Sequence, residues 1–110
     1  MPILDIFGHR ETLGDARDEI LFLRQFVADE LSVEEWPMDE SHISLRIHEI
    51  EGALIGEVEL VITAHFFADR IKSKDRICFN IREKLENRWN KQVRVWLKLV
   101  ELGYGVKNEE

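Results

Sequence analysis

The chain has 110 residues, of which 45% are hydrophobic and 34% are charged, and its formal net charge is -7. This length and balance predict one globular domain over residues 1–110, with a polar tail at about 106–110. The acidic charge argues against a nucleic-acid partner, and the absence of an apolar run of about 18 residues argues against a membrane span.

The first predicted elements are a strand at about 3–7 and a helix at about 12–31. Gly8 and the polar stretch after it end the strand. We expect the helix to begin at Thr12 or after Gly14, because glycine is a poor residue inside a helix. Apolar residues recur at three- and four-residue steps, as one helix face requires, at Leu13, Ala16, Ile20, Leu23, Val27 and Leu31.

The remaining pattern predicts a strand at 42–50, a strand at 57–66, a helix at about 73–89 and a last strand at 93–102. Trp36–Pro37 should stop any helix before the second strand. Asp69 or Ser73 could cap the second helix. The basic residues of "RIKSKDR" stand among acidic neighbours, which is typical of a solvated helix face.

The element order is therefore β-α-β-β-α-β, an α+β domain made of two β-α-β repeats at about 2–50 and 57–102. Each unit should be a right-handed crossover with parallel strands, so that two helices cover one face of a four-stranded mixed sheet. The other face would carry Val61, Trp96 and Val100, and such a bare face favours association. Both the ferredoxin-like sandwich and the tautomerase fold fit this order.

Proline at the second position favours the tautomerase fold. The stretches "MPILDIFG", "ISLRI", "VELVITAHFFADR" and "QVRVWLKLVELGYG" resemble the tautomerase superfamily from Pro2 to about Gly105. That superfamily includes 4-oxalocrotonate tautomerase and macrophage migration inhibitory factor. Length and element order resemble its two-repeat branch, including bacterial members.

The resemblance implies keto–enol proton transfer on a small carboxylated substrate, without a cofactor, at a subunit interface of a homotrimer. Pro2 would be the general base, since an amine in an apolar pocket near cations loses affinity for its proton. This requires removal of Met1, which is usual before proline. The alternative is a non-catalytic ferredoxin-like or tautomerase-like binding or structural module, in which Pro2 only begins an edge strand.

The resemblance also suggests substrate-binding residues, each with a plainer interpretation beside it. Arg10 follows the first strand, at about the place of a substrate arginine in 4-oxalocrotonate tautomerase, but it could be a surface loop residue. Arg46 could reach a neighbouring subunit's proline or form an ion pair with Glu49 or Glu59 in the trimer lumen. Arginine can bind a carboxylate bidentately.

Two further residues are candidates for the pocket wall. His65 lies near the end of the third predicted strand, and Tyr104 lies in the "GYG" segment. Each could instead be a packing residue. The lysine that follows the first helix in macrophage migration inhibitory factor has no match in the acidic stretch "SVEEWPMDE".

Other chemistries have weaker support. His42 and His48 would lie roughly 20 Å apart on a regular strand, too far for one metal ion, so no metal site is expected. Cys78, on the apolar side of a helix, is expected to be inert. A single cysteine and the lack of a secretory signal together predict a reducing, cytoplasmic location.

Overall fold

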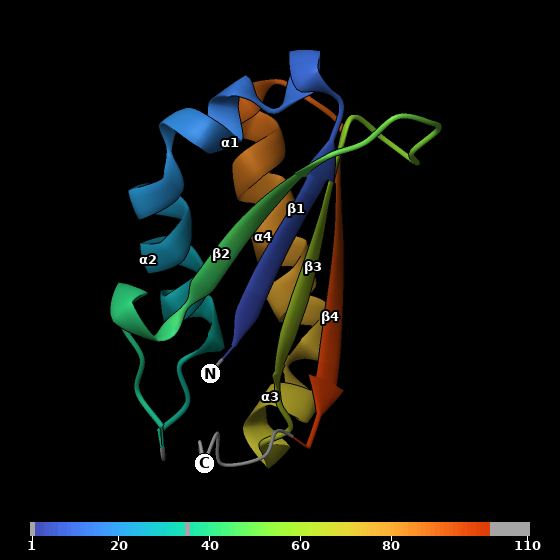
Figure 1. Ribbon diagram of the computed structural model, residues 1–110. Coiled ribbons are helices and arrows are strands. Elements are labelled where there is room, and N and C mark those ends of the chain that lie inside the picture. Colours follow the sequence, from blue (N-terminus) through green and yellow to red (C-terminus); the bar gives the residue numbers. More distant parts are fainter. Residues whose placement is uncertain (1, 35, 102–110) are drawn as a thin grey trace, which may run out of the picture.

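The computed structural model describes residues 2–34 and 36–101. Four strands form one sheet, and the helices lie on one side of it, as Figure 1 shows. The strands are β1 (Ile3–Gly8), β2 (Ser44–Glu49), β3 (Val58–His65) and β4 (Val93–Val100). The helices are α1 (Gly14–Asp18), α2 (Ile20–Leu31), α3 (Ala68–Lys72) and α4 (Lys74–Trp89), with short 3-10 turns at Arg10–Thr12 and Glu40–His42.

The strand order is β2-β1-β3-β4. β1 pairs in parallel with β2, β3 pairs in parallel with β4, and the central β1–β3 pair is antiparallel. The predicted mixed four-stranded sheet and its parallel pairs are therefore confirmed. All four strands lie within about two residues of the predicted bounds, because period-two alternation locates a half-buried strand well.

The sheet has one buried face and one open face. Along β3, Val58, Leu60, Ile62 and Ala64 are fully buried, and the residues between them are half-buried. The helices cover the buried face through Leu23, Val27, Ile81 and Leu85, each of which is fully buried. The core therefore lies between the sheet and the helical layer.

The first predicted helix is divided in two, and a short additional helix precedes the second. The first breaks at Glu19, whose φ of -124° and ψ of 33° are not helical, and α1 begins at Gly14 rather than after it. The second prediction, 73–89, matches α4, but α3 comes directly before it and Ser73 forms the junction. Ser73 is the N-cap residue of α4 without a side-chain capping bond, so the predicted cap is not formed.

No helix in the described ranges combines the length and the apolarity that crossing a lipid bilayer requires.

Candidate functional site

Pro2 lies at the N-terminal end of β1 and is buried. Its carbonyl oxygen accepts a hydrogen bond from the backbone N–H of Ser44 at 3.1 Å, which holds the start of β1 against β2. Every second residue of a strand faces the same side of the sheet. Pro2 alternates in step with the buried residues Leu4 and Ile6, so it lies on the helix-covered side. The β1–β3 register pairs Ile3 with Thr63, and its continuation brings Pro2 beside Ala64.

A buried guanidinium lies at the same end of the sheet. Arg70, in α3, is only 1% exposed. Its Nε donates to the carbonyl oxygen of Leu31 at 2.9 Å, and its Nη1 donates to the carbonyl oxygen of His65 at 2.9 Å. Nη2 approaches the sulfur of Met38 at 2.9 Å, and the group lies 4.8 Å from the centre of the Phe67 ring.

The burial of Arg70 corrects the prediction that "RIKSKDR" is a solvated helix face. An arginine is almost never fully buried unless its donors are satisfied. Here the end of α2 and the end of β3 both supply carbonyl oxygens to it. The β1–β3 register puts His65 at the end of the sheet where β1 begins, so the positive charge of Arg70 lies at the same end of the sheet as Pro2. Sequence reasoning missed this residue.

His65 ends β3 at this same end of the molecule. Neighbouring residues of a strand face opposite sides of the sheet. Because Ala64 is buried on the helix-covered side, the His65 side chain lies on the open side, in contrast to Pro2. Its ring centre lies 5.1 Å from that of Phe66 and 5.0 Å from that of Phe67. The structure therefore brings His65 close to Pro2 along the backbone, while the two side chains belong to different faces.

Arg10 lies at the other end of β1. The strand between it and Pro2 is six residues long, roughly 20 Å at about 3.3 Å per residue. Arg10 is 81% exposed and donates from Nε to Glu49 at 3.0 Å. This hydrogen bond lowers the pKa of the Glu49 carboxyl. Within one chain, Arg10 and Pro2 do not share a site.

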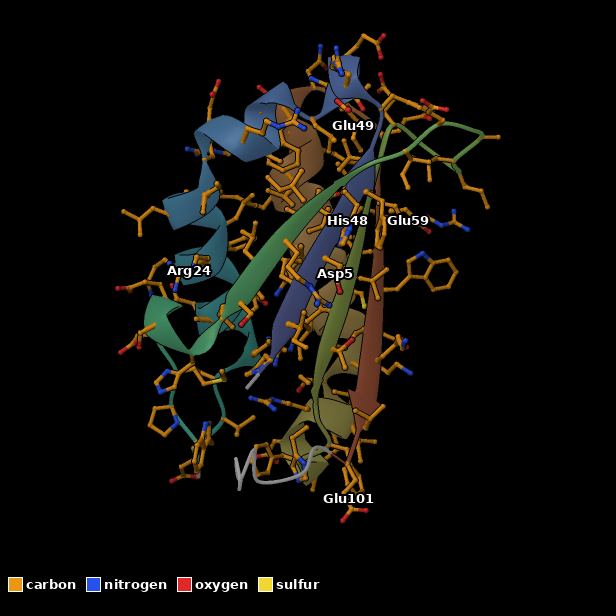
Figure 2. The ribbon with its side chains drawn as sticks, viewed as in Figure 1. Asp5, Arg24, His48, Glu49, Glu59 and Glu101 are labelled. Atoms are coloured by element: carbon orange, nitrogen blue, oxygen red, sulfur yellow. The ribbon has the colours of Figure 1, made fainter. Side chains whose placement is uncertain are left out.

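Arg46 lies in β2 on the open face, and within the chain it pairs with Asp5, a contact that the sequence did not predict. Nε and Nη2 of Arg46 donate to the two oxygens of Asp5 at 2.8 and 3.1 Å. His48 Nε2 lies 2.7 Å from the same carboxylate and stacks its ring on Phe7 at 4.5 Å. Figure 2 shows Asp5 and His48 near each other on the sheet.

Asp5 is the half-buried centre of this cluster, with 14% of its side chain exposed. Burial raises the pKa of its carboxyl, but hydrogen bonds from Arg46 and His48 outweigh burial and hold the pKa below its usual value. The register explains the contact, because Asp5 pairs directly with Arg46 across β1 and β2. The fixed charges of this cluster occupy the part of the open face between Pro2 and Arg10.

Tyr104 lies outside the described residues. Burial raises the pKa of the Cys78 thiol, which keeps it in its unreactive protonated form. Over residues 2–34 and 36–101, no three histidine, cysteine, aspartate or glutamate side chains gather as a metal site would require.

Comparisons with known proteins give the fold independent support. No family model and no curated protein sequence matches the chain. Solved structures do match. A macrophage migration inhibitory factor-like protein from Entamoeba histolytica aligns with a TM-score of 0.63 and 12% identity, over 94% of each chain.

Two enzyme structures match over nearly the whole chain. Malonate semialdehyde decarboxylase, solved as wild-type, proline-to-alanine mutant and inactivated forms, aligns with a TM-score of 0.65 and 12% identity, over 96% of this chain and 92% of the other. A fused 4-OT, solved as a symmetric trimer, aligns with a TM-score of 0.61 and 15% identity, over 98% of this chain and 94% of the other. The protein has the tautomerase fold, as the resemblance predicted.

Proposed function

We propose that this protein is a tautomerase-like enzyme that transfers a proton on a small carboxylated keto or enol substrate, with Pro2 as its general base. The observation that carries the proposal is the burial of Pro2 at the start of β1, at the same end of the sheet as the buried charge of Arg70, in a tautomerase fold. The enzyme structures with this fold favour catalysis over a binding module.

The base must be a free secondary amine, which Pro2 becomes once Met1 is removed. A buried environment and a nearby guanidinium both disfavour the protonated form of an amine. Such an amine can be unprotonated near neutral pH and still accept a proton, which is the condition for a general base.

The reaction is a balanced proton transfer. The Pro2 nitrogen takes the proton from the carbon next to a substrate carbonyl, and the C–H electron pair becomes the carbon–carbon double bond of the enol. The carbonyl oxygen gains the negative charge and then takes the proton from the Pro2 ammonium, which restores the free amine. The fixed positive charge of Arg70, whose donors are held by the protein, would stabilise the charge on that oxygen through space, without having to reorganise.

We propose further that the protein works as a homotrimer, in keeping with the symmetric trimer of the fused 4-OT. Arg10 is highly exposed at the far end of β1 from Pro2 of its own chain, so it could serve only the Pro2 of a neighbouring subunit. Arg46 is tied to Asp5 and would have to exchange that partner for a substrate carboxylate. His65 would form the wall of the pocket on the open side of the sheet.

The test follows ketonisation of the enol of a 2-oxo acid by its loss of ultraviolet absorbance. The Pro2→Ala variant should lose the activity, because it replaces a rigid secondary amine with a primary amine. Pro37→Ala is the matched control, since Pro37 is exposed and is the only other proline in the chain. Intact mass establishes for each variant that Met1 is absent. Equal rates for Pro2→Ala and wild-type protein would overturn the base assignment.

A further inference from the structure

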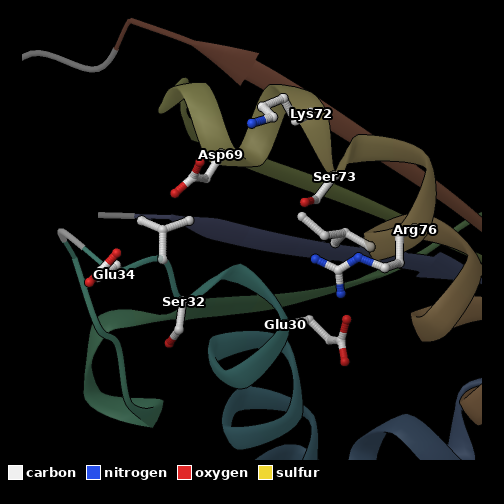
Figure 3. Close-up of a pocket in the computed structure, with 9 residues that line it drawn as sticks. Glu30, Ser32, Glu34, Asp69, Lys72, Ser73 and Arg76 are labelled. Atoms are coloured by element: carbon white, nitrogen blue, oxygen red, sulfur yellow. The ribbon is translucent and has the colours of Figure 1, made fainter.

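A cavity lies between the C-terminal end of α2 and the junction of α3 and α4. Its volume is about 370 Å³, within the roughly 300–1,000 Å³ range of small-molecule pockets. Figure 3 shows side chains from both walls that face the same space. Pro2, Arg10, Arg46 and His65 do not line it, so its lining residues differ from those of the proposed proton-transfer site.

The two walls carry opposite charges. Glu30, at the end of α2, and Glu34, just after it, supply carboxylates on one side. Lys72 and Arg76, on either side of the α3–α4 junction, supply an ammonium and a guanidinium on the other. Asp69 adds a carboxylate beside Lys72, and the Ser73 side chain lies between the two cations (Figure 3).

These charges are not neutralised by one another within the part of the chain that the structure describes. Lys72, Arg76 and Glu34 have no ion pair there within 4.0 Å, although two helices elsewhere are joined by a 2.6 Å pair between Arg88 and Glu19. Glu30 accepts a hydrogen bond from Asn80 at 3.2 Å, which holds its carboxylate toward the cavity side of α2. The cavity thus keeps two cations and three carboxylates available to a ligand.

We propose that this cavity binds a small zwitterion that carries one carboxylate and one ammonium group, such as an amino acid. The ligand's carboxylate would be bound by Lys72 and Arg76, and its ammonium group by Glu30 and Glu34. The three carboxylates of the lining disfavour a dianion, and the two cations disfavour a dication. Buried Ile77 and half-buried Val33 give the cavity a small apolar area against which a short carbon chain can pack.

The test measures calorimetric binding of two isomeric zwitterions, 4-aminobutyrate and L-2-aminobutyrate. Butyrate lacks their ammonium group, and propylamine lacks their carboxylate. At least one isomer should bind about tenfold more tightly than either single-charge analogue, because each analogue loses one charged contact; tenfold corresponds to about 1.4 kcal/mol. Amide chemical shifts should change at residues 32–34 and 69–77.

Arg76→Gln should weaken binding of that isomer about fivefold or more. Arg82 is also exposed on α4 but lies outside this cavity. Arg82→Gln is therefore the matched control and should leave the affinity for that isomer unchanged. Pro2→Ala should also leave this affinity unchanged, so the zwitterion site and the proton transfer by Pro2 can fail separately. The proposal is overturned if both isomers bind no better than the analogues, as they would if Arg76 and Glu30 pair across the cavity. It is also overturned if Arg76→Gln has no effect.

Discussion

The Nε of Arg70 donates a 2.9 Å hydrogen bond to the carbonyl oxygen of Leu31, the last residue of α2, 39 positions earlier in the chain. Together with the bond to the His65 carbonyl, it joins α3, the end of α2 and the end of β3. The last carbonyls of a helix have no partner inside that helix, so Arg70 supplies a donor that α2 itself lacks. One side chain therefore completes the fold and puts a positive charge at the same end of the sheet as Pro2.

Replacement of this guanidinium should be costly. Arg70→Met keeps an unbranched apolar chain but leaves the carbonyls of Leu31 and His65 without this donor. We expect a loss of about 2–4 kcal/mol in the free energy of unfolding, since an unsatisfied buried polar group costs about 1–3 kcal/mol. Urea unfolding of the variant and of the wild-type protein measures this loss. The same change at exposed Arg82 should cost less than about 0.5 kcal/mol. Equal midpoints for the two variants would show that the Arg70 bonds do not stabilise the fold.

A pH dependence should come from Glu19, where α1 and α2 meet. Hydrogen bonds from Arg88 and Trp89 hold the pKa of the Glu19 carboxyl below its usual value. A lowered folded-state pKa gives stability that is fully present above the unfolded pKa, about 4.3, and is lost as the pH falls through the folded value. Glu19→Gln should therefore cost about 1 kcal/mol at pH 7 and progressively less as the pH falls below about 4.

Urea midpoints of wild-type and Glu19→Gln protein from pH 7 to about pH 2.5 check this prediction. Glu83→Gln, on an exposed position of α4, controls for general acid effects. A difference between wild-type and Glu19→Gln that stays constant over this range would refute the link between the Arg88 contact and the titration.

Two glycines should respond oppositely to alanine. Gly8 ends β1 and is buried, and a Cβ there would lie 2.8 Å from Cδ2 of Leu13, a fully buried core residue. Gly8→Ala should destabilise the fold by about 1–3 kcal/mol through overpacking. Gly14, in the first turn of α1, has no atom within 4 Å of the corresponding position. Gly14→Ala should stabilise it by about 0.4–1 kcal/mol.

Thermal unfolding of the two variants against wild-type protein checks these signs. If Gly8→Ala melts at the wild-type temperature, Leu13 can move aside and the contact does not constrain the strand end. If Gly14→Ala lowers the melting temperature, the helical conformation assigned to Gly14 is wrong.

The sheet was predictable from the sequence because alternation is a local signal. Val58, Leu60, Ile62 and Ala64 alternate with less buried residues, and the structure buries exactly this set of four within β3. The helix breaks were not predictable in the same way. The buried face continues from Ala16 to Leu23 across the break at Glu19, whereas Ile20, which the apolar pattern placed on the same face, is 42% exposed.

The candidate site was only partly predictable. Pro2 could be found because its chemistry depends on its position in the chain. Arg70 could not, because its burial depends on carbonyl oxygens of Leu31 and His65 that only the folded chain brings to it. For the same reason, the ion pair of Arg46 with Asp5 was not predicted, because it depends on the parallel register of β1 and β2.

The most direct test of the account is a titration of the Pro2 nitrogen by 15N NMR on protein labelled at proline. The chain has two prolines, and the Pro37 nitrogen, an amide, serves as an internal reference. We predict that the Pro2 nitrogen titrates, with a pKa lower in the folded protein than in the same protein unfolded in urea. A Pro2 nitrogen that does not titrate, or that has the same pKa in both states, would contradict its role as a general base.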